Sequence, residues 1–194
     1  LVELVKEFNL IPGSDIKDKF GYKSLYLKEL MISVNERLKD INEGRINKEL
    51  YRVKGAVDIL GELKQYGIEL YLASGTDEKN VINEAGILGY ANHFEGKIYG
   101  SKDDIKKFSK KMVIESIIKD NSLKEFEFAV IGDGPVEIRE GKKRSGISIG
   151  IASDEKNGNG LNLNKRTKLI KAGADIIIPD FSEYQALLSF LFPQ

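Results

Sequence analysis

The chain has 194 residues, no cysteine, and thirty basic residues that balance thirty acidic ones. Its length suits one sizeable hydrophobic core, and the absence of cysteine excludes a disulfide framework and a thiolate metal site. The zero net charge gives no field that favours nucleic acid or an anionic membrane surface, and the apolar runs are far shorter than the ~20 residues of a membrane span. We therefore expect a cytoplasmic globular protein with neither nucleic acid nor membrane as a partner.

Residues 1–52 contain no strand pattern and predict a small all-helical module. Apolar residues recur at helical spacing from Leu1 to Phe8, and Pro12 then breaks the pattern. A longer amphipathic helix follows between Leu25 and Ile41. We expect this module to be separate from the rest of the chain.

From residue 53 to residue 194, strand patterns alternate with helix patterns. The alternation predicts an α/β fold with a parallel sheet that is covered by helices on both faces, a Rossmann-like three-layer arrangement. Ligands of such sheets bind beyond the carboxyl ends of the strands. Strands are expected at 68–74, 127–132, 147–153 and 174–180, with a short strand or loop at 93–101, and helices at 55–67, 75–88, 107–123, 135–146, 164–173 and 182–192.

The first polar cluster at an expected strand end is Ser74-Gly75-Thr76, followed by a helix. A hydroxyl and free backbone N–H groups at a helix start favour an anion such as phosphate. The alternative is that Ser74, Thr76 or Asp77 only caps the helix.

Two further clusters carry charge. Lys110 lies at an expected helix start, where a cation is unfavourable unless an anion is near, although it belongs to a basic stretch that could simply be solvated. Asp133 ends an apolar strand, with Gly134 freeing the turn and Glu137 one helical turn later. Two carboxylates there suit Mg²⁺, and the alternative is helix capping by Asp133 with Glu137 as a first-turn acid.

Taken in order, these clusters resemble the haloacid dehalogenase superfamily of phosphohydrolases from about residue 54 to residue 192. The resemblance implies that Ser74, with Gly75 and Thr76, binds phosphate, and that Lys110 neutralises the phosphoryl group, with Lys111 as a near alternative. Asp133 would bind Mg²⁺, with Glu137 in place of the more usual second aspartate. Residues 1–52 resemble the helical cap of phosphoglycolate-phosphatase-like members, and residues 53–194 the core.

One departure from the family is serious. Its first motif is a strand ending Asp-x-Asp-Gly-Thr, which supplies the nucleophile, and no aspartate of this sequence fits that pattern. That strand would be the central one of the sheet, so we expect a gap beside the strand that ends at Asp133. Either the motif lies upstream of Leu1 or on another chain, which we favour, or the protein is a relative that has lost catalysis.

The implied function is a Mg²⁺-dependent phosphomonoester hydrolase that forms an aspartyl-phosphate on a small phosphorylated metabolite. The 194 residues by themselves are expected to be inactive for want of the nucleophile. The alternative is a non-catalytic phosphate-binding or regulatory module of a larger protein. A receiver-like or nucleotide-binding domain fits the order of serine, lysine and aspartate less well.

Overall fold

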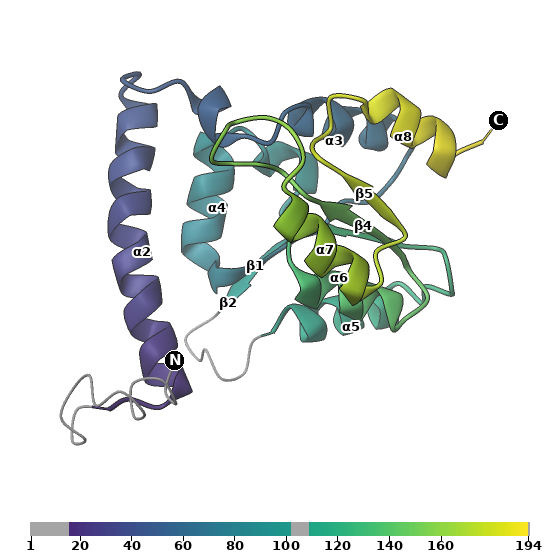
Figure 1. The fold of residues 1–194 in the computed structure, drawn as a ribbon, viewed down its shortest axis with the longest axis horizontal. Helices are drawn as coiled ribbons and strands as arrows, with labels where there is room; N and C mark the ends of the chain where they lie inside the picture. The colour runs from purple at the N-terminus through teal and green to yellow at the C-terminus, as the bar shows by residue number, and fades with distance from the viewer. Residues whose placement is uncertain (1–15, 102–108, 194) are drawn as a thin grey trace.

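The computed structural model describes residues 16–101 and 109–193, so the helix expected at residues 1–8 lies outside the described residues. Figure 1 shows the arrangement of the elements. In chain order they are α2 (Lys19–Asn42), η2 (Lys48–Tyr51), α3 (Ala56–Gln65), β1 (Leu72–Asp77), α4 (Glu78–Ile87), η3 (Ala91–Phe94), β2 (Ile98–Ser101), α5 (Lys110–Asp120), β3 (Ala129–Gly132), α6 (Pro135–Lys142), β4 (Ile147–Ile151), α7 (Leu163–Ala172), β5 (Ile176–Ile178) and α8 (Tyr184–Leu191).

The predicted α/β fold is confirmed. Every described strand pair is parallel: β1 with β2, β3 with β4, and β4 with β5. Helices α3 and α8 pack their apolar side chains on one face of the β4–β5 region, and α6 and α7 pack on the opposite face (Figure 1). Parallel strands are stable in this setting because both of their faces are buried.

The sheet is interrupted between β1 and β3. Strands β1 and β2 form one sheet, and β3, β4 and β5 form another, in that order. Among residues 16–101 and 109–193, no strand pairs with the second edge of β1 or of β3. The interruption lies beside β3, which Asp133 follows, and this is where the family resemblance predicted a gap.

Strand β1 begins and ends later than the sequence predicted. The apolar pattern placed it at residues 68–74, but β1 runs from Leu72 to Asp77, because pairing with β2 begins at Leu72 opposite Ile98. The register shifts between Ala73 and Asp77. Ser74 lies in the strand as predicted, but so do Gly75 and Thr76, and the prediction of a turn from Gly75 was wrong.

Helix α2 stands beside α4 at one end of the molecule (Figure 1). Asp18 caps it by accepting a hydrogen bond from the backbone N–H of Gly21 at 2.7 Å. Leu38 and Ile41 are buried, whereas Leu25 and Leu30 are exposed, so only the last turns of the helix are fully packed. Within the described ranges, no helix combines the length and apolar character that crossing a bilayer requires.

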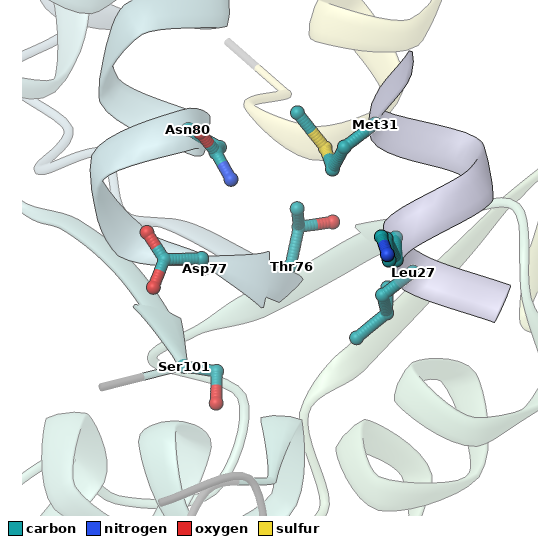
Figure 2. Close-up of a pocket in the computed structure, with 7 residues that line it drawn as sticks. Leu27, Met31, Thr76, Asp77, Asn80 and Ser101 are labelled. Carbon is teal, nitrogen blue, oxygen red and sulfur yellow. The ribbon is translucent and has the colours of Figure 1, made fainter. Parts of the chain in front are cut away.

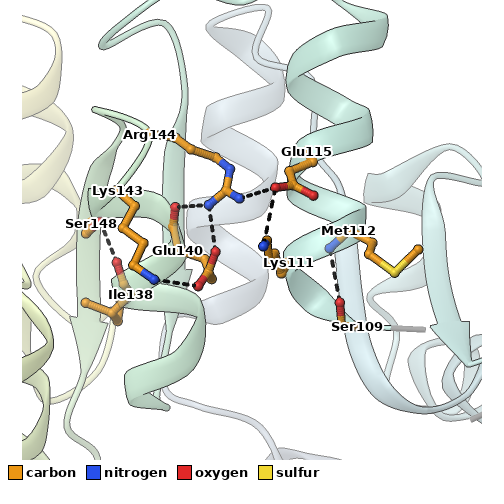
Figure 3. Close-up of polar contacts among 9 residues, drawn as sticks. All are labelled: Ser109, Lys111, Met112, Glu115, Ile138, Glu140, Lys143, Arg144 and Ser148. Carbon is orange, nitrogen blue, oxygen red and sulfur yellow. Dashed lines mark hydrogen bonds and ion pairs between the residues drawn. The ribbon is translucent and has the colours of Figure 1, made fainter. Parts of the chain in front are cut away.

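Helices α5 and α6 are joined by a charged network centred on Arg144 (Figure 3). The Arg144 guanidinium donates to Glu140 at 2.7 Å and to Glu115 of α5 at 2.5 Å. The hydrogen bond from Arg144, supported by Lys143, lowers the pKa of the Glu140 carboxyl below its ordinary value of 4.5, although burial opposes this. Glu140 is buried, and Arg144 links it to Glu115 of α5 through charge-assisted hydrogen bonds.

We expect Arg144→Met to reduce the free energy of unfolding by about 1–3 kcal/mol, because it leaves the buried Glu140 carboxylate without its main donor. Since the pKa of Glu140 is lowered in the folded state, its contribution is present above pH 4.5 and is lost as the pH falls through the folded pKa. Urea unfolding at pH 7 and pH 3.5 tests this. The exposed neighbour Lys143→Met is the control, and an equal effect of both variants would contradict the assignment.

Candidate phosphate and metal site

The residues from two separate sequence clusters meet at the carboxyl end of β3. The Lys110 Nζ atom, at the start of α5, lies 3.1 Å from Glu137 Oε1, in the first turn of α6. The anionic neighbour that a lysine at a helix start favours is thus a side chain of this protein. Lys111 instead faces Glu115 at 3.9 Å and is more exposed, so Lys110 is the lysine that reaches the site.

Two glycines make room for Glu137. A Cβ atom on Gly132 would lie 2.5 Å from Glu137 Cγ, and one on Gly134 would lie 3.0 Å from both carboxylate oxygens. Gly134 has an ordinary φ of −104°, so a strained turn is not what requires glycine here. Gly134 caps α6 and donates its N–H to Glu137 Oε1 at 3.2 Å, which confirms Glu137 as a first-turn acid and shows that capping by Asp133 was wrong.

Gly132→Ala is expected to displace the Glu137 side chain and to lower the free energy of unfolding by about 1–3 kcal/mol, because the new methyl group overlaps its Cγ atom. The matched control is Gly61→Ala in α3, where a Cβ meets nothing within 4 Å. This control should be neutral or stabilising by about 0.5–1 kcal/mol. Thermal unfolding of both variants decides the matter, and equal stability of the two would contradict the close approach of Glu137.

Asp133 lies at the same strand end and contacts a residue that the sequence reasoning missed. Lys165 Nζ, from α7, is 3.3 Å from Asp133 Oδ2 and 2.6 Å from Glu155 Oε1. Burial alone would lower the pKa of Lys165, but the bond to Glu155 and the charge of Asp133 raise it above its usual value, so this lysine stays charged. The sequence could have pointed to Lys165, because it lies in the first turn of α7. A cation at the start of a helix is unfavourable unless an anion is near.

The donor chemistry at this strand end fits Mg²⁺ in part. Mg²⁺ is held in many proteins by one or two carboxylates, waters and substrate phosphates, and Asp133 and Glu137 supply two carboxylates. Asp133 is more than half exposed and so accessible, whereas Glu137 is buried against Lys110. No group of three His, Asp or Glu side chains within the described part of the chain could hold a metal by itself.

Ser74 and Thr76 lie on the other side of the interruption in the sheet, in β1. The N–H of Thr76 donates to Ser74 Oγ at 3.3 Å, and helix α4 is capped by Asp77, which accepts from the N–H of Lys79 at 3.0 Å. Of the three residues proposed as caps, Asp77 caps α4, and the hydroxyls of Ser74 and Thr76 do not.

A pocket of about 270 Å³ lies where α2 approaches the ends of β1 and β2. Figure 2 shows Leu27 and Met31 of α2 on one side of it, with Thr76 and Asn80 on the other. The pocket connects the helical segment to the strand that holds Ser74. It is lined by Leu27, Lys28, Met31, Thr76, Asp77, Asn80 and Ser101.

The candidate aspartates that failed the nucleophile pattern have structural partners where they are described. Asp18 caps α2, and Asp180 accepts from the N–H of Ser182 at 2.8 Å. Asp175 accepts from the N–H of Ser148 at 3.0 Å and pairs with Lys142. Asp15, Asp103 and Asp104 lie outside the described residues.

Known structures resemble this one in fold. A predicted phosphatase from Clostridium acetobutylicum is 24% identical, with a TM-score of 0.56 over 70% of this chain and 58% of that one. A HAD family hydrolase from Deinococcus radiodurans with bound phosphate and sodium is 15% identical, with a TM-score of 0.60 over 72% of this chain and 59% of that one. A protein assigned as a phosphoglycolate phosphatase from Lactobacillus delbrueckii is 18% identical, with a TM-score of 0.54 over 73% of this chain and 54% of that one. The chain spans less than two thirds of each.

No curated protein matches the chain. The sequence profile of the haloacid dehalogenase-like hydrolases, however, matches residues 3–152, which is more than half of the chain. With the fold and the strand-end residues, this match shows that the chain belongs to the haloacid dehalogenase-like hydrolase family.

Proposed function

We propose that this chain is the phosphate- and metal-binding part of a Mg²⁺-dependent phosphomonoester hydrolase, with a small phosphorylated metabolite in the cytoplasm as its substrate. The observation that carries the proposal is the meeting of Lys110 and Glu137 beside Asp133 at the carboxyl end of β3. Lys110 is 27 residues from Glu137 in the sequence, and helix capping accounts only for Glu137.

In this proposal each side chain has a distinct task. Ser74 donates its hydroxyl to one oxygen of the phosphoryl group, and Thr76 stands beside it in the same strand. Lys110 turns from Glu137 toward the phosphoryl group and neutralises its charge as the reaction proceeds. Asp133 and Glu137 would hold Mg²⁺, which when bound stabilises the charge of the phosphoryl oxygens.

The nucleophile belongs to a segment that the described residues do not include. An aspartate on it would attack phosphorus and form an aspartyl-phosphate, while the bond from phosphorus to the leaving oxygen breaks; water then hydrolyses the intermediate. The pocket between α2 and β1 would receive the leaving group, so residues 1–52 would act as a cap that selects the substrate. In this arrangement residues 53–194 are the core.

One observation favours the alternative, a non-catalytic phosphate-binding or regulatory module. Both candidate metal ligands are already paired with lysines, Asp133 with Lys165 and Glu137 with Lys110, so each carboxylate has a cationic partner in this chain. A module that binds phosphate through these lysines would need no nucleophile.

Titration calorimetry with inorganic phosphate, with and without Mg²⁺, tests the proposal. We expect Mg²⁺ to raise the affinity for phosphate. In Asp133→Asn this gain in affinity should be about tenfold smaller, because a carboxylate ligand of the metal is lost. Asp154→Asn is the matched control, because Asp154 bonds to Asn157 in the loop after β4. Phosphate binding that is indifferent to Mg²⁺ would favour the non-catalytic module, and no phosphate binding would contradict both.

A further inference from the structure

Lys165 lies between two carboxylates that come from different parts of the chain. Its Nζ atom is 3.3 Å from Asp133 Oδ2, after β3, and 2.6 Å from Glu155 Oε1, in the loop after β4. The proposed function assigns Asp133 to the metal but leaves Lys165 and Glu155 without a task. One cation is thus shared between a candidate metal ligand and a second acid.

The backbone of Lys165 is held at the start of α7. Its N–H donates at 3.0 Å to the side chain of Asn162, which caps the helix, and Leu169, one turn further on, is fully buried. The Lys165 side chain itself is 25% exposed. A lysine side chain has several rotatable bonds, so its ammonium group can shift between two nearby acceptors while the helix stays in place.

The loop that carries Glu155 is also held in place. Ser153 and Leu161 form an antiparallel bridge at its base, and the N–H of Asp154 donates to the carbonyl of Gly160 at 3.1 Å. The Ser153 hydroxyl donates to Glu155 Oε1 at 3.5 Å. Glu155 is therefore kept within reach of α7 by contacts other than its ion pair.

Lys165 does not make way for a metal by losing its proton. Burial lowers the pKa of this lysine, but the hydrogen bond to Glu155 and the charge of Asp133 outweigh burial and raise the pKa above its usual value. An ammonium group and a divalent cation on the same carboxylate repel each other. Binding of a cation at Asp133 therefore requires that the lysine move, and Glu155 is an acceptor that already contacts it.

The other lysine at this strand end is arranged differently. Among residues 16–101 and 109–193, Lys110 has Glu137 as its one carboxylate partner. It needs an added anion, such as phosphate, to leave Glu137. Lys165 has its second acceptor within the chain.

We propose that Lys165 is a resident counterion of the metal site and that Glu155 is the positioning residue that controls it. Without a metal, Lys165 neutralises Asp133. When a divalent cation binds there, the ammonium group gives up Asp133 and keeps its bond to Glu155. This inference rests on the proposed function, because it takes Asp133 as the metal ligand, and it extends that function to two residues that do not bind the metal.

The two partners should have opposite effects on metal affinity. Lys165→Met removes the competing cation and should raise the affinity for Mg²⁺ about three- to tenfold. Glu155→Gln removes the second acceptor and leaves Lys165 on Asp133, so it should lower the affinity by a similar factor. Since Glu155 acts only through Lys165, the double variant Lys165→Met/Glu155→Gln should match Lys165→Met within about twofold.

Titration calorimetry with Mg²⁺ alone, and electron paramagnetic resonance with Mn²⁺ alone, measure these affinities. Lys168→Met, at an exposed residue of α7, and Asp154→Asn, whose carboxylate bonds to Asn157, remove the same charges and should leave the affinity within about twofold. Lys165→Arg keeps the charge and should also stay within about twofold. The NMR signal of the Lys165 Nζ nitrogen should shift on addition of Mg²⁺, but not in Asp133→Asn.

The double variant separates this device from general electrostatics. Additive effects, which would return the double variant to the affinity of the original chain, would overturn the proposal, and so would equal effects of Lys165→Met and Lys168→Met. If Asp133→Asn weakens Mg²⁺ binding but Lys165→Met does not strengthen it, this inference alone fails. If Asp133→Asn has no effect on Mg²⁺ binding, or the original chain binds no Mg²⁺, the proposed metal site fails with it.

Discussion

The 194-residue chain is expected to hydrolyse p-nitrophenyl phosphate no faster than buffer, with or without Mg²⁺. Phosphoryl transfer through an aspartyl-phosphate needs a nucleophilic aspartate at a strand end, and Asp133, which follows β3, is paired with Lys165 and suited to the metal. The other described aspartates that were considered, Asp18, Asp175 and Asp180, are engaged in caps and ion pairs.

The measurement is a phosphate-release assay at a high protein concentration, repeated after further purification. Purification removes the activity of a trace contaminant, whereas intrinsic activity stays with the protein. The control is Asp133→Asn of the same preparation. Mg²⁺-dependent release that survives purification and is lost in Asp133→Asn would show that the chain holds a nucleophile after all.

The second large effect is expected for Lys110→Met, which should weaken phosphate binding by about ten- to a hundredfold. A hydrogen bond to a charged group contributes about 1.5–3 kcal/mol, and Lys110 is the lysine that reaches the strand end. Lys111→Met is the matched control, because Lys111 faces Glu115 on the exposed side of α5, and its phosphate affinity should stay within twofold of the original.

Lys110→Met also leaves the buried Glu137 carboxylate without its cation, so a loss of binding could reflect a loss of structure. The double variant Lys110→Met/Glu137→Gln removes that unpaired charge. If the double variant is stable and still binds phosphate weakly, the role of Lys110 is direct. If it recovers phosphate binding, the lysine acts only through Glu137 and our assignment is wrong.

The order of elements was predictable because apolar periodicity is a local property of the sequence. The helices around Val113 and Leu169 and the strands of β3, β4 and β5 lie where the pattern placed them, to within a few residues. Gly67 also ends α3 as expected, with a φ of +74°. Strand β1 was misplaced because its limits depend on where β2 pairs with it, which a local pattern does not contain.

The candidate site was predictable in its position but not in its contacts. The rule that ligands bind at carboxyl ends of parallel strands led to Asp133 and Glu137. The partners of these carboxylates, Lys110 and Lys165, are 27 and 32 residues distant in sequence, and only the fold brings them together. The reason for the two glycines beside Asp133 also depends on the fold, because it is the returning Glu137 side chain that requires them.

The roles of Ser74, Lys110, Asp133 and Glu137 in a reaction stay predictions. They rest on one central claim, that these residues form the phosphate and metal part of a hydrolase whose nucleophile is on another segment.

The most direct measurement is the turnover of p-nitrophenyl phosphate by a fusion in which an apolar segment ending Asp-x-Asp-Gly-Thr is joined to Leu1 through a flexible linker. The comparison is the same fusion carrying Asn at the first aspartate. Our account predicts Mg²⁺-dependent hydrolysis by the first fusion, loss of that activity in the Asn version, and loss on Asp133→Asn. A fusion whose amides in β1 and β3 are protected, but which neither turns over substrate nor forms a phosphoenzyme with Mg²⁺ present, would contradict it.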